Sequence, residues 1–411
     1  MRIFLVLLLT SIIHAQASLI DYDHPYHSTY TNKGIVVSQN YLSSDIGVEI
    51  LNQGGNAVDA AIAVGFSLAA TLPRAGNIGG GGFMQIYIES DKTILSIDFR
   101  STAPSLATGE LYQELKSNDD DVTRKGYKAI AVPGTVAGLY KAHELYGSLP
   151  MEMLLQPTID LLEEGIPMTQ DLYHAINVGK YISDDPESNS IFKENLSPNT
   201  PLFNEDLKQT LIKLQKFGQD VFYRGEIADQ IEKEMIKNDG LIRKSDLENY
   251  KVNIIQPIKT TYRDKQIFAM GAPSGGGIVI LTALNVLENF QLDGLNPNSA
   301  ITYHLLSESL KYGHQNRSKL VGDPAFSDVP YDMLLSKKLA KEKAKKISLT
   351  SATNPKTINK YGDRINSTYE ESKDTTHYSV VDKDGNGVSV TYTLGYSFGS
   401  GVTIPGTGIL T

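Results

Sequence analysis

The alternation of polar and apolar positions near the end of the chain predicts a β-hairpin. Two β-rich runs, His377 to Asp382 and Val388 to Leu394, flank five turn-forming residues at 383–387, KDGNG. Such a pattern is typical of two antiparallel strands joined by a short turn. If His377 pairs with Thr393, hydroxyl-bearing and large apolar side chains lie on opposite faces, and a one-residue slip would mix them. The polar face then carries Thr375, His377, Ser379, Thr391 and Thr393, and the apolar face carries Tyr378, Val380, Val390 and Tyr392.

The first hundred residues show a pattern of alternating strands and helices. Gly34 to Ser38 is typical of a buried strand, and an amphipathic helix follows, capped by Ser43 or Ser44. Residues 56–71 are almost wholly small and apolar. They predict a buried helix, because Asp59 interrupts the run and it is too short to span a membrane. Further strands are predicted over Phe83–Glu89 and Thr93–Phe99.

The middle of the chain is mainly helical, and the segment before the hairpin is polar. Residues 129–250 show helical periodicity with caps or glycines at the helix ends. Strands return at 254–263 and 266–270, and Lys337 to Lys346 is a basic helical run with a solvated face. Ser348 to Lys373 is poor in apolar residues and rich in Ser, Thr, Asn and Lys. We expect it to form an exposed, mobile tether.

A glycine-rich run lies between the predicted buried helix and the next strand. Residues 76–83 read GNIGGGGF. A phosphate-binding loop needs a G-K-[ST] ending, or a strand before it and a helix after it. Neither is present, since residues 83–89 alternate like a strand. We therefore favour a turn where backbones pack closely over a nucleotide site.

Composition narrows the class of protein. The 411 residues are 41% hydrophobic and carry a formal net charge of −9. This length supports a sizeable core in one large domain or two smaller ones. The negative charge argues against nucleic-acid binding. The chain has no cysteine, which excludes disulfide bonds and thiolate catalysis.

Residues 1–17 have the features of a secretory signal peptide. Arg2 precedes a short apolar run, Ile3 to Ile13, and residues 15–17 match an A-x-A cleavage site. The run is too short to span a membrane comfortably, and an uncleaved anchor is the alternative. We predict a periplasmic or secreted protein with no membrane attachment beyond this signal. His24 and His27 have no further ligands nearby, so we predict no metal site there.

The threonines at the head of the predicted hairpin suggest hydroxyl chemistry. A threonine hydroxyl is a weak nucleophile, but a threonine that begins a chain carries its own base, an α-amine with a pKa of roughly 7.7–8.0. Thr375 would gain this amine only if the precursor cut itself between Asp374 and Thr375. The β-branch restricts χ1 and helps to direct the hydroxyl toward the scissile carbonyl. Thr393, across the hairpin, could hydrogen-bond this hydroxyl and orient it.

The sequence DTTHYSVVDKDGNGVSVTYTL at 374–394 resembles the start of the small subunit of γ-glutamyltranspeptidases, which are N-terminal-nucleophile hydrolases. Other segments agree, namely SQNYLSSDIGVEILNQGGNAVDAAIAV, NIGGGGFM, IDFR, AVPGTVAG and APSGGG. The resemblance covers nearly the whole chain after residue 33. It implies that Thr375 is the nucleophile and Thr393 its threonine partner. It also implies that Arg100, in IDFR, holds the substrate's α-carboxylate, for which a guanidinium fork is well shaped.

The resemblance also implies a fold and a set of substrates. The implied fold is α+β, the four-layer αββα sandwich of N-terminal-nucleophile hydrolases. After loss of a signal peptide at 1–17, one domain would combine a large-subunit part, 18–374, with the start of a small subunit, 375–411. Implied substrates are glutathione, glutamine and other γ-glutamyl compounds, with water or acceptor amino acids and peptides receiving the γ-glutamyl group. No metal or organic cofactor is implied.

Two features depart from the family pattern. Only residues 375–411 follow the expected cut, whereas the family's small subunit is several times longer. We therefore expect a sandwich that is incomplete at its C-terminus and lacks the glycine pair of the oxyanion hole. Gly395 stands where many relatives have an asparagine that touches the substrate. Two alternatives stay open: an inactive truncated fragment or pseudogene product, and a β-lactam side-chain acylase of similar fold.

Overall fold

The computed structural model describes residues 30–117, 119–194, 196–358 and 375–411. The chain divides into two units, Met1–Lys33 and Gly34–Thr411, and all described helices and strands belong to the second. The predicted signal peptide at 1–17, the two histidines at 24 and 27, and Asp374 lie outside the described residues. Within the described part, no helix has both the length and the apolar character needed to cross a membrane.

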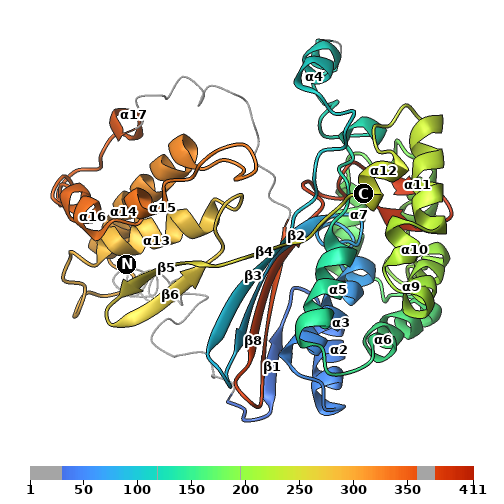
Figure 1. The fold of residues 1–411 in the computed structure, drawn as a ribbon, viewed down its shortest axis with the longest axis horizontal. Coiled ribbons are helices and arrows are strands. Elements are labelled where there is room, and N and C mark those ends of the chain that lie inside the picture. Colours follow the sequence, from blue (N-terminus) through green and yellow to red (C-terminus); the bar gives the residue numbers. More distant parts are fainter. Residues whose placement is uncertain (1–29, 118, 195, 359–374) are drawn as a thin grey trace, which may run out of the picture. The chain divides into compact units, whose positions relative to one another are not determined.

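The main sheet has six strands in the order β1-β7-β8-β2-β3-β4, each antiparallel to its neighbours (Figure 1). The hairpin from the end of the chain therefore lies between strands from its beginning. Two further antiparallel pairs are β5–β6 and β9–β10. The strand bounds are β1 Gly34–Val37, β2 Gly81–Ile88, β3 Thr93–Phe99, β4 Asn253–Ile255, β5 Ile258–Tyr262, β6 Lys265–Ala269, β7 Thr376–Asp382, β8 Gly387–Thr393, β9 Thr403–Ile404 and β10 Ile409–Leu410.

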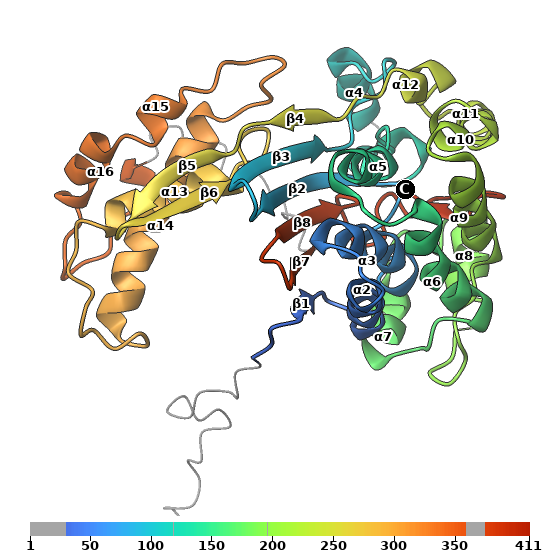
Figure 2. The same ribbon diagram turned by 60° about the horizontal axis from the view of Figure 1, so that its bottom comes forward.

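Helices α2, α3 and α5 contact the main sheet, and together with it they form the largest hydrophobic core of the described residues (Figure 2). Helices α13, α14 and α16 pack with one another around smaller hydrophobic clusters. The combination of helices and an antiparallel sheet agrees with the predicted α+β class. The helix bounds are α2 Tyr41–Asn52, α3 Ala57–Thr71, α4 Gly109–Lys116, η1 Tyr127–Ala129, α5 Thr135–Tyr146, α6 Met151–Glu164, α7 Gln170–Val178, α8 Pro186–Phe192, α9 Glu205–Phe217, α10 Asp220–Tyr223, α11 Glu226–Lys237, α12 Lys244–Glu248, α13 Gly276–Leu287, α14 Ala300–Leu320, α15 Tyr331–Leu334, α16 Lys337–Ala344 and α17 Pro355–Ile358.

Helix α3 is buried along its whole length, as its small apolar residues predicted. Its N-cap is Asn56, whose side chain accepts hydrogen bonds from the first turn, while the Asp59 side chain accepts one from the Asn56 N–H. The buried Asp59 carboxylate also accepts from the N–H of Ser148 at 2.9 Å and from its hydroxyl at 2.5 Å. These bonds offset the cost of placing a charge inside the core.

The predicted cap of helix α2 is wrong. The cap is Asn40, whose side chain accepts from the N–H of Leu42 at 2.9 Å. Ser43 lies inside the first turn and is buried against α3, where its hydroxyl bonds to the hydroxyl of Thr71 at 2.8 Å. Asparagine and serine are comparably good caps, and burial of Ser43 decided which one is used.

Strands β7 and β8 form the predicted hairpin in a register two residues away from the predicted one. His377 pairs with Thr391 rather than with Thr393. A shift of two residues keeps every side chain on its own face, so polarity could not distinguish the two registers. The turn decides the register. Asp382 Oδ1 accepts from the N–H groups of Asp384 and Asn386, both at 3.0 Å, and β8 begins at Gly387.

The described part of the predicted tether, residues 348–358, is mostly exposed as expected, but side chains of α14 hold its backbone. Three side chains of α14, spaced four and three residues apart, hold the backbone of this segment. His304 Nε2 donates to the Ser348 carbonyl at 2.7 Å. Glu308 Oε1 accepts from the Thr353 N–H at 3.1 Å, and Lys311 Nζ donates to the Thr353 carbonyl at 2.8 Å. Helix α17 follows, and residues 359–374 lie outside the described residues.

Candidate functional site

The two faces of the β7–β8 hairpin differ as predicted. The apolar face lies in the core, where Tyr378, Val380, Val390 and Tyr392 are buried. The two adjacent threonines at the start of β7 point in different directions. Thr376 is fully buried, whereas Thr375 is exposed at the head of the polar face. Of the two, only Thr375 can present its hydroxyl to a substrate.

Thr375, Thr393 and Arg100 lie in one row across the main sheet. Thr393 pairs with Gly81 of β2, and the next residue of β2, Gly82, pairs with Phe99 of β3. Continuing these registers by one residue places Thr375 beside Thr393 and Arg100 beside Gly81. With neighbouring strands ~4.8 Å apart, the backbones of Thr375 and Arg100 are about 14 Å apart. An extended arginine side chain and a substrate the size of glutamate together span such a gap.

Glycines at the start of β2 allow this row to form. A Cβ at Gly80 would lie 2.3 Å from the carbonyl oxygen of Thr393. A Cβ at Gly81 would lie 2.2 Å from the backbone nitrogen of Ser101, directly after Arg100. Any side chain here would push apart the strands that carry the two candidate residues. The predicted close packing of backbones in the glycine-rich run is therefore confirmed, and its link to Thr393 and Arg100 was missed.

The Thr393 hydroxyl is oriented by the turn that follows β8. Thr393 Oγ1 accepts a hydrogen bond from the N–H of Gly395 at 2.9 Å. Gly395 has φ +95°, a conformation that residues with a side chain rarely adopt. A Cβ at this position would meet no atom within 4 Å. The glycine at 395 is therefore explained by backbone conformation rather than by lack of space.

A histidine surrounded by hydroxyls occupies the polar face next to this row. His377 Nδ1 lies 2.7 Å from Thr391 Oγ1, and Nε2 lies 3.1 Å from Ser379 Oγ and 3.2 Å from Ser389 Oγ. Partial burial lowers the pKa of His377 and favours the neutral imidazole. These contacts link β7 to β8 on the polar face, next to Thr375 and Thr393 along the two strands. The sequence analysis placed His377, Ser379 and Thr391 on one face, but it did not include Ser389 or indicate that these residues form a cluster.

Arg100 follows β3, and its exposed side chain lies over an aromatic ring. The guanidinium carbon is 5.9 Å from the centre of the Phe83 ring, within the range of cation–π attraction. The Arg100 N–H donates to Asp98 Oδ1 at 2.9 Å, and the Arg100 carbonyl accepts from the Tyr250 hydroxyl at 2.9 Å. Burial raises the pKa of Asp98, although the Arg100 N–H and positive charge oppose that shift.

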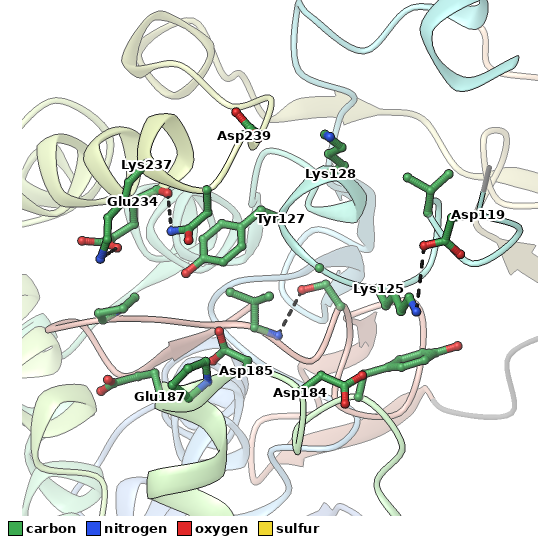
Figure 3. Close-up of a pocket in the computed structure, with 18 of the residues that line it drawn as sticks. Asp119, Lys125, Tyr127, Lys128, Asp184, Asp185, Glu187, Glu234, Lys237 and Asp239 are labelled. Atoms are coloured by element: carbon green, nitrogen blue, oxygen red, sulfur yellow. Dashed lines mark hydrogen bonds and ion pairs between the residues drawn. The ribbon is translucent and has the colours of Figure 1, made fainter. Parts of the chain in front are cut away.

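A hollow of about 880 Å³ lies between α8, the end of α11 and the segment after β8 (Figure 3). None of Thr375, Thr393 and Arg100 lines it. Many of the residues that line it are charged. Burial is the main cause that raises the pKa of Glu187, and the negative charges of Asp206 and Asp185 raise it further. Among the described residues, no three His, Cys, Asp or Glu side chains are placed to hold a metal ion. Because none of the row residues Thr375, Thr393 and Arg100 lines this hollow, it gives no support to their predicted roles. Its charged walls are formed by Asp119, Lys125, Lys128, Asp184, Asp185, Glu187, Glu234, Lys237 and Asp239.

The sequence profile of the family described as Gamma-glutamyltranspeptidase matches residues 43–411. The chain belongs to the gamma-glutamyltranspeptidase family. It is 40% identical over 396 residues to the glutathione hydrolase proenzyme of Escherichia coli (strain K12), covering 94% of this chain and 67% of that protein. It is 35% identical to the Acylase ACY 1 proenzyme of Pseudomonas sp. (strain SE83), covering 92% of this chain and 68% of that one. The chain thus spans about two thirds of the length of these relatives.

A solved structure agrees with this family assignment. The crystal structure of Helicobacter pylori gamma-glutamyltranspeptidase superimposes with a TM-score of 0.77 at 34% identity, covering 85% of this chain and all of that chain. The resemblance to the family and the N-terminal-nucleophile hydrolase fold are therefore confirmed. The roles of Thr375, Thr393 and Arg100 stay predictions.

Proposed function

We propose that this gamma-glutamyltranspeptidase family member cleaves the γ-glutamyl amide bond of glutathione and related compounds through an acyl-threonine intermediate. The observation that carries the proposal is the row of Thr375, Thr393, Gly81 and Arg100 on the polar face of the sheet. The backbones that carry the Thr375 hydroxyl and the Arg100 cation are about 14 Å apart there, a gap that the arginine side chain and a γ-glutamyl group together can span. The γ-glutamyl group would pass to water or to the amine of an acceptor amino acid or peptide.

Self-cleavage would come first. The Thr375 hydroxyl attacks the Asp374 carbonyl carbon, the peptide C–N bond breaks, and the Thr375 nitrogen takes up a proton. Water then hydrolyses the resulting ester, which frees the Asp374 carboxylate and restores the threonine hydroxyl. Thr375 now begins a chain, and its α-amine, with a pKa of roughly 7.7–8.0 when unperturbed, acts as the base.

Substrate cleavage would use the same hydroxyl. The Thr375 α-amine removes the hydroxyl proton, the oxygen attacks the γ-carbonyl, and the departing amine leaves with that proton. Water or an acceptor amine then attacks the ester and releases the γ-glutamyl group. Thr393, whose own hydroxyl is oriented by the Gly395 N–H, would hydrogen-bond the nucleophile and hold it in line.

Arg100 would select the substrate. Its exposed guanidinium can form paired hydrogen bonds with the α-carboxylate of a γ-glutamyl group. A glutaryl amide keeps the terminal carboxylate that Arg100 could bind and lacks only the α-amine. Comparison of γ-glutamyl with glutaryl amides therefore separates this function from that of an acylase through recognition of the α-amine, and not through Arg100. We also propose a periplasmic or secreted location, on the basis of the signal-like residues 1–17.

Intact mass under denaturing conditions tests the nucleophile. Protein made from the complete gene should yield two polypeptides, the second beginning at Thr375. Thr375→Ala should stay as one chain and show no turnover. Thr376→Val is the matched control, because Thr376 is adjacent, fully buried and has a hydroxyl with no partner among the described residues. This control should be cleaved normally.

Two outcomes would contradict the proposal. Normal cleavage of Thr375→Ala would show that another residue is the nucleophile. A single uncleaved chain for the natural sequence, without turnover of any γ-glutamyl amide, would favour the inert alternative. Cleaved protein that prefers glutaryl over γ-glutamyl amides would instead identify an acylase.

A further inference from the structure

Arg100 lies beyond the last residue of β3 that pairs with β4. The pairs between these strands end with Asp98 and Asn253. The backbone of Arg100 therefore has no partner strand on that side. Two side chains replace it, since Asp98 accepts from the Arg100 N–H and Tyr250 donates to the Arg100 carbonyl, each at 2.9 Å. Both polar groups of the Arg100 backbone are thus bonded by side chains, one from β3 itself and one from Tyr250.

Tyr250 is itself fixed in place by an aromatic neighbour. Its ring stacks on that of Tyr223, with centres 5.8 Å apart and planes 10° from parallel. Tyr223 is buried, and its hydroxyl donates to the Pro133 carbonyl at 3.0 Å and accepts from the Ala137 N–H at 3.1 Å. The Tyr250 ring therefore rests on a side chain that is bonded to the start of α5.

Gly134 leaves the space that Tyr250 occupies. A Cβ at this position would lie 2.0 Å from the Tyr250 hydroxyl and 2.1 Å from the Phe99 carbonyl oxygen. Gly134 belongs to the AVPGTVAG segment at 131–138. Burial, together with Tyr223 and Asp98, raises the pKa of Tyr250, so its hydroxyl keeps its proton and stays a donor.

We propose that Tyr250 is a positioning residue for Arg100, holding the Arg100 backbone so that its guanidinium meets the α-carboxylate of the γ-glutamyl substrate. The inference rests on the proposed function. Tyr250 acts through Arg100 and does not itself touch the substrate. Without its hydroxyl, the Arg100 carbonyl loses a neutral hydrogen bond and the side chain samples more orientations. Substrate binding weakens, while the chemistry at Thr375 keeps its geometry.

Steady-state kinetics of Tyr250→Phe test this role. The KM for a γ-glutamyl amide should rise about 2- to 10-fold, the range expected for one neutral hydrogen bond, with the effect on KM larger than that on kcat. Self-cleavage should proceed, because Arg100 takes no part in it. Tyr140→Phe is the matched control. The Tyr140 hydroxyl also donates to a backbone carbonyl, that of Leu214 at 2.7 Å, so its loss should leave KM unchanged.

A double-mutant cycle separates positioning from general structural damage. If Tyr250 acts through Arg100, adding Tyr250→Phe to Arg100→Ala should leave KM where Arg100→Ala alone sets it. An equal rise in KM in both backgrounds would overturn the inference while leaving the carboxylate contact of Arg100 intact. An unchanged KM for Tyr250→Phe alone would also overturn it. If Arg100→Ala itself leaves KM unchanged, the proposed substrate contact fails and the inference fails with it.

Discussion

Two tyrosines on the buried face of the β7–β8 hairpin should respond in opposite ways to loss of the hydroxyl. Tyr378 and Tyr392 pack edge to face, with ring centres 5.9 Å apart, and each is 1% exposed. Both hydroxyls lie near Gly65 of α3. The Tyr392 hydroxyl donates to the Gly65 carbonyl at 2.8 Å. The Tyr378 hydroxyl has no hydrogen-bond partner among the described residues.

The magnitudes follow from these environments. A buried hydroxyl without a partner costs about 1–3 kcal/mol. Removing the Tyr378 oxygen forfeits a few dispersion contacts worth roughly 0.5 kcal/mol. Tyr378→Phe should therefore raise the free energy of unfolding by about 0.5–2.5 kcal/mol. Tyr392→Phe removes a satisfied hydrogen bond and should lower it by about 0.5–1.5 kcal/mol.

Calorimetric unfolding at neutral pH measures both variants against the parent. The pKa of each tyrosine is raised by burial, so neither ionises near neutrality. For a chain of this size, 1 kcal/mol corresponds to a Tm shift of roughly 1 °C. The two variants should therefore separate by about 1–4 °C, on opposite sides of the parent. A Tyr378→Phe protein that melts below the parent would refute the reasoning, because its hydroxyl would then have to be making a stabilising bond.

Three further predictions concern the residues around the threonine row. Thr393→Ala should lower the acylation rate about 10-fold, the effect of one hydrogen bond, and Thr393→Ser should restore most of it; unchanged burst kinetics would make Thr393 structural only. Burial holds the pKa of His377 in the native state below its value in the unfolded state, so the unfolded state takes up the proton first. The free energy of unfolding should therefore fall as the pH drops from about 6.5 toward the native pKa. His377→Gln should flatten this part of a Tm–pH profile, and a parallel profile would contradict the assignment. Gly80→Ala should cost at least about 1–3 kcal/mol by driving a Cβ against the Thr393 carbonyl, and normal self-cleavage with unchanged Tm would argue against that contact.

The hairpin shows what the alternation of polar and apolar residues could predict and what it could not. Side chains alternate with a period of two along a strand, so polarity alone correctly separated the buried Tyr378 and Tyr392 from the exposed Thr375. The same period makes registers that differ by two residues equivalent in polarity. The actual pairing of His377 with Thr391 depends on how Asp382 closes the turn. That correction moves Thr375 directly opposite Thr393.

Local composition also determined the buried helix and the close-packed glycines. The small apolar residues of α3 predicted its burial, and the glycine-rich run lacks the G-K-[ST] ending of a phosphate-binding loop. The proposal of hydroxyl chemistry at Thr375 came from the residue type and its place at the head of a strand. Each of these three predictions depends only on residues that are near one another in the chain.

Only the tertiary structure decided which distant residues meet. The sheet order places the hairpin beside β2, and β2 beside β3, so Arg100 shares a row with Thr375 from 275 positions away. Tyr250 reaches the Arg100 carbonyl because Gly134 leaves room for it. Residues 348–353 are held in place because α14 supplies hydrogen-bond partners for the backbone of Ser348 and Thr353. Such contacts depend on how strands and helices pack, which no single stretch of sequence reports. Thr375 could therefore be proposed as a nucleophile from its own residue type, whereas the side chains that hold the backbone of Arg100 could not be foreseen.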